Sequence, residues 1–120
     1  MDFVLKNTIE LHATQTKLCL PILDRLYKKM LLDINFHCIK VCDNLIIDGH
    51  HRYLASLLAN FNLEIAKTPS PSVVSVISWN SIEYVDEDWD TPAKINMLNE
   101  QDANYNHVSL SKIVESLNMP

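Results

Sequence analysis

At residues 46–55 the chain reads Ile-Ile-Asp-Gly-His-His-Arg-Tyr-Leu-Ala, an apolar strand followed by a polar turn and an apolar helix. Gly49 in the turn is the only glycine among 120 residues. Average composition would supply roughly eight glycines in a chain of this length. Glycine adopts φ > 0 freely and lets the backbone approach another group closely. We therefore expect the turn to need one of these two properties.

Two predicted strands and a hairpin lead into this turn. Residues 36–41 and 45–47 are rich in apolar residues and contain β-branched side chains, which favour strands. The pair Asp43-Asn44 stands between them, and both residue types tolerate the positive φ of a tight hairpin turn. Upstream, apolar residues recur at helical spacing over residues 22–31, so we expect an amphipathic helix there.

The remaining segments carry shorter patterns. Prolines indicate loops, β-branched runs indicate strands, and apolar residues three and four apart indicate helices. These patterns predict a strand within residues 1–10, a helix over 50–60, a loop over 67–72, a buried strand over 73–77, a surface loop over 83–92, and helices over 94–101 and 110–117, the last capped by Ser109. We expect a compact single α+β domain over residues 1–120, in which helices pack on a small mixed sheet.

Composition and charge restrict the classes of function. Hydrophobic residues make up 48% of the chain, enough for a folded core, and no apolar run approaches the ~20 residues of a membrane span. We expect a cytoplasmic protein without membrane contact. The formal net charge is −5, and residues 83–102 hold seven of the fifteen acids against one base. Without a basic stripe the chain is a poor general nucleic-acid coat, because phosphate neutralisation supplies most non-specific affinity.

The cysteines and histidines do not follow a common metal motif. Cys19, Cys38 and Cys42 lack the paired spacing of zinc sites and are interpreted as small buried hydrophobes in a reducing compartment. Adjacent histidines are poor joint ligands for one metal. A zinc ion would need further ligands, with His12, His37 and Asp48 as the candidates, and no metal site is predicted.

The turn itself has the chemistry of a phosphate site. A strand, a glycine turn and a helix N-terminus present several backbone N–H groups in one direction, and the helix dipole favours anions there. Arg52 adds a planar, permanently charged fork that suits phosphate. His50 and His51 could bind phosphate or shuttle protons, but they point about 100° apart on a helix and cannot share one role. In the alternative interpretation Asp48 merely caps the helix, Gly49 merely permits the turn, and Arg52 pairs with a carboxylate.

A second polar cluster stands just upstream of the first helix. The side chains of Thr14 and Gln15, together with His12, could complete a phosphate or base pocket. The alternative is an ordinary capping loop. Trp79 and Trp89 could stack on a base, but a place in the core or at the surface is the preferred interpretation.

Residues 46–55 resemble the strand–turn–helix signature of the ParB/sulfiredoxin superfamily, especially its ParB-like nuclease domains. In that signature a hydrophobic strand leads to a Gly-x-x-Arg turn, matched here by Gly49 and Arg52, and then to an alanine-bearing helix, matched by Ala55. The similarity covers residues 8–62. It implies a ParB/sulfiredoxin-like fold whose turn holds the phosphates of a nucleotide or polynucleotide. Members include partition proteins that bind a cytidine nucleotide, ATP-dependent sulfiredoxins, a free-serine kinase, and bacterial nucleases and toxin domains.

Departures from the family's pattern exclude some of its members' functions for this chain. His50 stands where sulfiredoxin carries its nucleophilic cysteine, so repair of sulfinic acid is not expected. The partition proteins have a downstream helix-turn-helix, for which this chain has no room. Their arginine patch is also missing, because the turn ends Arg52-Tyr53-Leu54. What remains is a phosphate-site domain with a His-His-Arg turn.

Two functional hypotheses follow. In the first, preferred from the sequence, the chain is a phosphoester enzyme of the nuclease or phosphodiesterase kind, with a nucleotide-dependent kinase as a second version. His50 or His51 acts as acid or base, Arg52 stabilises the charge on the phosphoryl oxygens, and Asp48 orients a histidine or holds Mg²⁺ that accompanies a nucleotide. The upstream polar cluster positions the substrate.

In the second hypothesis the chain is a non-catalytic nucleotide-binding module or switch that uses the same turn. The acidic residues 83–102 would then offer a surface to a protein partner, and the alternative for them is a solvated loop. The two hypotheses predict different effects of substitutions at the turn. An enzyme loses turnover when a histidine is removed, whereas a binding module depends chiefly on Arg52.

Overall fold

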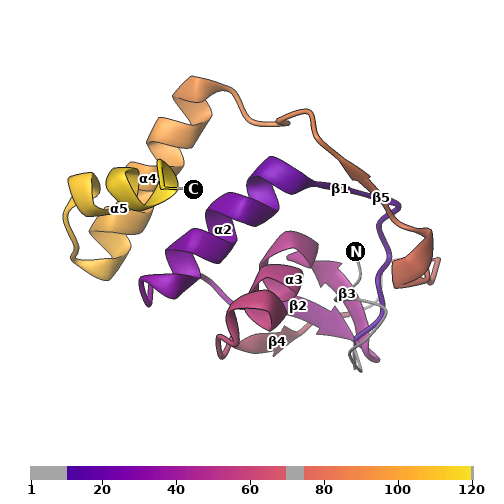
Figure 1. Cartoon of the computed structure of the whole chain (residues 1–120). Coiled ribbons are helices and arrows are strands. Elements are labelled where there is room, and N and C mark those ends of the chain that lie inside the picture. The colour runs from indigo at the N-terminus through magenta and orange to yellow at the C-terminus, as the bar shows by residue number, and fades with distance from the viewer. Residues whose placement is uncertain (1–10, 70–74, 120) are drawn as a thin grey trace.

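Helix α2 (Leu20–Leu31) runs between two groups of elements in the computed structural model, which describes residues 11–69 and 75–119 (Figure 1). On one side α2 packs against α3 (His50–Ala59), and on the other against α5 (Leu110–Leu117), which also contacts α4 (Pro92–Asn106). These helices, with two small sheets, make a compact α+β domain. The predicted α+β class and the predicted helices over 22–31, 50–60 and 110–117 are confirmed.

The strands form two sheets rather than the single mixed sheet that we expected. In the first, β2 (Ile39–Cys42) lies between β3 (Leu45–Asp48), to which it is antiparallel, and β4 (Ile65–Lys67), to which it is parallel. In the second, β1 (Lys17–Cys19) pairs in parallel with β5 (Glu83–Val85). Parallel partners join segments that are distant along the chain, so local patterns do not reveal them.

The hairpin between β2 and β3 forms as predicted, although its first strand covers Ile39–Cys42 rather than residues 36–41. Asp43 and Asn44 have φ angles of 48° and 67°, the left-handed conformations that a two-residue hairpin turn requires. Ile39 and Val41 on one strand and Ile46 on the other are buried. Their burial fixes the register of the hairpin and therefore the position of the turn that follows β3.

Several predicted boundaries are wrong. Residue 67 belongs to β4 rather than to a loop, residues 83–85 form β5 rather than a surface loop, and α4 extends well beyond 94–101 in both directions. Thr91 caps α4 by accepting the N–H of Lys94, and Pro92 occupies its first turn, which explains the earlier start. The 3-10 helix η1 (Trp79–Ser81), which precedes β5, is a further element that the sequence patterns did not indicate.

The predicted buried strand over 73–77 is only partly described. Within residues 75–77 no strand forms. Val76 is 59% exposed rather than buried, and Ile77 makes only an isolated bridge to Ala13. The strand predicted within residues 1–10 lies outside the described residues, as does part of the loop predicted over 67–72.

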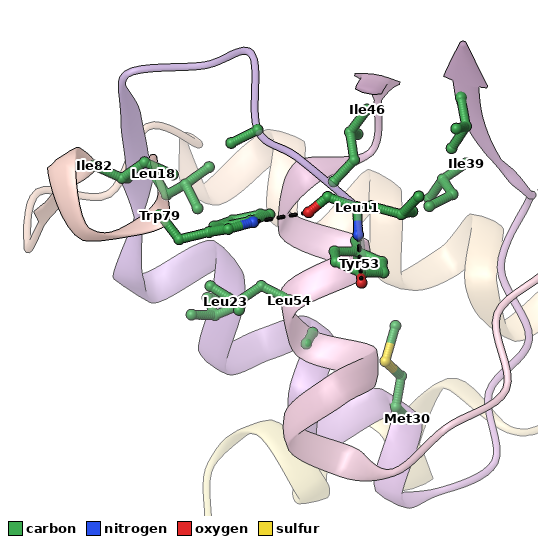
Figure 2. Packing of buried hydrophobic residues seen from close by; sticks show 13 residues of the cluster. Leu11, Leu18, Leu23, Met30, Ile39, Ile46, Tyr53, Leu54, Trp79 and Ile82 are labelled. Atoms are coloured by element: carbon green, nitrogen blue, oxygen red, sulfur yellow. Dashed lines mark hydrogen bonds between the residues drawn. The ribbon is translucent and has the colours of Figure 1, made fainter. Parts of the chain in front are cut away.

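The main core lies between α2, α3 and the strands (Figure 2). The Trp79 indole N–H donates to the carbonyl of Leu11 at 2.9 Å, and the Leu11 N–H donates to the hydroxyl of Tyr53 at 3.4 Å. These bonds attach the segment before β1 to η1 and to α3 respectively. A smaller cluster of Ile34, Ala103 and Ile113 lies beneath α4 and α5. Of the two places preferred for Trp79, the core or the surface, the structure shows the core, since the residue is 8% exposed.

Candidate functional site

Gly49 joins the end of β3 to the start of α3, and its geometry excludes a side chain. Its φ is +104°, in the region that L side chains rarely adopt. A Cβ built on Gly49 would lie 2.4 Å from Cγ2 of Ile39 on the neighbouring strand. Both properties that the sequence suggested, positive φ and close approach, therefore apply at this turn.

The N-terminus of α3 keeps free donors. No side chain within residues 11–69 and 75–119 caps this helix, so the alternative in which Asp48 is the cap is wrong. The first intrahelical bond runs from the Tyr53 N–H to the Gly49 carbonyl at 2.9 Å. Among the described residues, no acceptor bonds the N–H groups of His50, His51 and Arg52. These are the orphan donors that make a helix N-terminus attractive to anions.

Arg52 lies beside the turn and is held by two contacts. Its Nη1 donates to the His37 carbonyl at 3.1 Å, and its Nη2 lies 3.4 Å from Oδ2 of Asp48. The Asp48 side chain is 65% exposed, so this ion pair is screened by solvent and weak. The guanidinium is thus positioned over the turn without being committed to a buried partner.

His50 fastens the segment before β1 to α3. The Thr14 N–H donates to its Nε2 at 2.9 Å, and the imidazole is 4% exposed. Thr14 also donates its hydroxyl to the carbonyl of Ile46 at 2.6 Å. Burial lowers the pKa of His50, against an opposing effect of Asp48. Because Nε2 accepts an N–H, its lone pair is in use and the ring proton of this tautomer is on Nδ1.

His51 has the same kind of partner on a different element. Its Nε2 accepts the N–H of Cys19, the N-cap residue of α2, at 2.9 Å. Its ring meets Trp89 edge-on with centroids 5.4 Å apart. Burial, and next the neighbouring His50, lower the pKa of His51 to about 4, while Asp90 opposes the shift. Trp89 itself is 46% exposed, as expected for a surface aromatic.

Of the upstream polar cluster, His12, Thr14 and Gln15, only Gln15 lines the pocket over the turn. Gln15 lines the pocket described below, and its amide donates to the Lys17 carbonyl at 2.7 Å. Thr14 acts through His50 and does not line that pocket. The exposed His12 pairs through its backbone with Asn44 and Ile46 and is not brought to the turn.

A pocket of about 370 Å³ lies over the turn and unites it with α2. The turn contributes Gly49, both histidines and Arg52. Helix α2 contributes Arg25 and Lys29, which the sequence analysis missed. The remaining lining consists of apolar groups and carboxylates, namely Ile22, Leu26, Phe36, Leu98, Asp48, Asp90 and Asp102, with Gln15.

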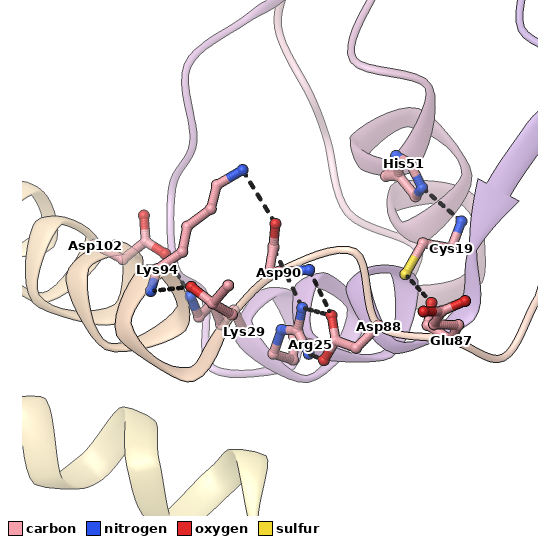
Figure 3. A network of polar contacts seen from close by, with 10 residues as sticks. Cys19, Arg25, Lys29, His51, Glu87, Asp88, Asp90, Lys94 and Asp102 are labelled. Carbon is pink, nitrogen blue, oxygen red and sulfur yellow. Dashed lines mark hydrogen bonds and ion pairs between the residues drawn. The ribbon is translucent and has the colours of Figure 1, made fainter.

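Carboxylates from the acidic segment reach the α2 cations (Figure 3). Arg25 binds Asp88 in bidentate fashion at 2.6 and 2.9 Å and lies 3.3 Å from Asp90. Lys29 donates to Asp102 at 2.6 Å. The hydrogen bond from Arg25 lowers the pKa of Asp88 below its usual range. The predicted description of residues 83–92 as a surface loop is therefore incomplete, because Asp88 and Asp90 pair with Arg25 of α2.

The described residues contain no group of three or more His, Cys, Asp or Glu side chains placed to hold a metal ion. Cys19, Cys38 and Cys42 are all free thiols. Cys19 is buried as expected, with its Sγ 3.4 Å from the Glu87 carbonyl, whereas Cys38 and Cys42 are only partly buried, against the expectation. Within residues 11–69 and 75–119 no helix is both long and apolar enough to span a membrane.

The chain matches no protein-family model, no curated protein and no solved structure. The resemblance of its turn to the ParB/sulfiredoxin signature thus stays a prediction that rests on residues 46–55.

The low pKa of His51 predicts a loss of stability in mild acid. The ring stays neutral in the folded chain down to about pH 4, whereas an unfolded histidine takes up its proton near pH 6.5. Between these values the unfolded chain binds more protons, so the free energy of unfolding falls as pH falls. One pKa unit corresponds to about 1.4 kcal/mol, and for this partly exposed ring we expect a loss of about 2 kcal/mol.

Urea unfolding at pH 7.5 and at pH 4.5 measures this effect. In His51→Gln, whose amide oxygen can accept the Cys19 N–H without titrating, the loss should be smaller, though His50 still contributes in the same direction. Equal losses in the two proteins would show that His51 is not the group responsible.

Proposed function

We propose that this chain is a nucleotide- or phosphate-binding module whose ligand sits in the pocket over the Gly49 turn. The observation that carries the proposal is the union, in one pocket, of a helix N-terminus with three cationic side chains, Arg25, Lys29 and Arg52. Backbone N–H groups and guanidinium forks are the donors that hold phosphate in proteins. The volume of about 370 Å³ is within the range of small-ligand pockets.

The state of the histidines favours binding over acid–base chemistry. A general base must offer its lone pair to a substrate proton. The Nε2 atoms of His50 and His51 instead accept backbone N–H groups of Thr14 and Cys19, each at 2.9 Å. With a pKa of about 4, His51 also holds too little proton near pH 7 to act as a general acid. Both rings thus serve to position the walls of the pocket.

The phosphoester enzyme is the second candidate. Asp48 favours it, because its largely exposed carboxylate lies at the pocket beside Arg52, where it could accept a proton or hold Mg²⁺ on a bound nucleotide. In that case Asp48→Asn should abolish turnover while affinity changes little. A binding module shows no turnover to lose, so the same variant discriminates the two functions.

Thermal unfolding with a ligand panel tests the proposal. The panel contains ATP, ADP, CTP, GTP and short oligonucleotides, each with and without Mg²⁺. A ligand that binds the folded state at a hundred times its Kd stabilises it by about 2.7 kcal/mol and raises the unfolding midpoint. Arg52→Ala should remove most of the rise.

Lys40→Ala is the matched control for Arg52→Ala. It removes an exposed cation from β2 that does not line the pocket, so the rise should persist. If every ligand raises the unfolding midpoints of Arg52→Ala and Lys40→Ala equally, the proposal of phosphate binding at this turn is wrong.

A further inference from the structure

The two cations that α2 gives to the pocket are already occupied by carboxylates of the chain itself. Lys29 lies 2.6 Å from Asp102 on α4, and Arg25 lies 3.3 Å from Asp90 on the segment that leads to α4. Asp90 is also 3.1 Å from Lys94. Figure 3 shows this row of contacts along α2.

These ion pairs are largely buried. The side chains of Lys29 and Asp90 are 5% and 7% exposed, and that of Arg25 is 16% exposed. Ion pairs at such depth are screened little by solvent and salt. An anion that binds Arg25 or Lys29 in the pocket therefore competes with these carboxylates for the same donors.

The charge of the pocket leads to the same conclusion. Its lining holds three permanent cations and three carboxylates, so it is close to neutral as it stands. Of the three carboxylates in the lining, Asp90 and Asp102 contact cations of α2, and both belong to the connected stretch 86–106 that ends in α4. Without these two carboxylates the lining would carry a net charge of +2.

We propose that Asp90 and Asp102 are built-in competitors for the ligand, and that the ligand carries at least two anionic groups because it must replace both. This inference rests on the proposed function. Arg25 and Lys29 are four residues apart on one helix, so their side chains lie on one face about 6 Å apart at Cβ. A di- or triphosphate can engage both cations and the α3 N-terminus together, whereas a single phosphate cannot displace both carboxylates.

Charge neutralisation tests the competition. In Asp90→Asn/Asp102→Asn the amides keep the shape and can still accept hydrogen bonds from Arg25 and Lys29. Asp88 does not line the pocket and keeps the Arg25 guanidinium in place. By calorimetric titration, inorganic tripolyphosphate should bind this variant about tenfold or more tightly than wild type, as expected when a close like charge is removed. Inorganic phosphate should bind wild type more weakly than tripolyphosphate does.

The control variant is Glu100→Gln/Glu115→Gln, which makes the same change in net charge on α4 and α5 away from the pocket. Its affinity for tripolyphosphate should equal that of wild type. If both double variants gain equally, the effect is one of overall charge and the competition is overturned. If wild type and Asp90→Asn/Asp102→Asn bind equally well, the competition is overturned while the phosphate site stands. If no protein binds either anion, the proposed function itself fails.

Trp89 supplies a second readout that needs no substitution of the acids. It lies between Asp88 and Asp90 with its ring against His51, so displacement of this segment changes its surroundings. Tripolyphosphate should alter the tryptophan emission of the wild type, and the change should disappear in Trp89→Phe although binding persists. Binding without any emission change in the wild type would show that the carboxylates stay in place, against the proposal.

Discussion

Gly49→Ala should lower the free energy of unfolding by about 3 kcal/mol or more. Two independent costs contribute. An L residue at a positive φ costs about 1–2 kcal/mol. Overpacking costs about 1–3 kcal/mol, and here the new methyl would lie 2.4 Å from Ile39 Cγ2 and 2.9 Å from Ile39 Cβ. In a domain of this size the unfolding midpoint should fall by about 10 °C.

The two costs can be separated by a second substitution. Ile39→Ala removes the nearest clashing atom, so Gly49→Ala should cost less in that background than in the wild type. Asn44→Gly is the control at an exposed position of positive φ, and its midpoint should change by no more than a few degrees. A midpoint for Gly49→Ala within 2 °C of wild type would contradict the geometry of this turn.

His50→Ala should lower the free energy of unfolding by about 3 kcal/mol. The substitution removes a side chain that is 4% exposed and packs near Trp79, with ring centroids 6.5 Å apart. It also leaves the N–H of Thr14 without its acceptor. An unsatisfied buried donor costs about 1–3 kcal/mol, and the cavity adds to this.

His50→Gln distinguishes the lost hydrogen bond from the lost volume. The glutamine oxygen can take the place of Nε2 as acceptor, so this variant should recover about half of the loss. Chemical denaturation of the three proteins measures the series. If His50→Ala is as stable as wild type, the imidazole does not hold the segment before β1, and it would be free for the acid–base role that the sequence suggested.

Elements with local signals could be predicted from the sequence. The helix behind Pro21, the Asp43-Asn44 hairpin and the helix behind Ser109 each depend on residues within one or two turns of the chain. The strands β1, β4 and β5 could not, because each has three residues and exists through a parallel partner elsewhere in the sequence. Hydrophobic periodicity over three residues carries no usable signal.

The same limit applies to the pocket. Gly49 and Arg52 stood out because the turn concentrates unusual residues in one place. Arg25 and Lys29 look like the polar face of an amphipathic helix, and their four-residue spacing does not say what that face meets. Their role depends on α2 packing between α3 and the α4–α5 pair. The histidines were recognised as site residues, but their backbone partners, Thr14 and Cys19, became visible only in the fold.

An NMR titration of the backbone amides with ATP tests the phosphate site most directly, because the proposed donors are themselves observed. The proposed site predicts that the largest shifts, saturating together, belong to the N–H groups of His50, His51 and Arg52, the donors that lack an acceptor in the described structure. Shifts confined to other parts of the chain, or none at millimolar ATP, would contradict a phosphate site at this turn.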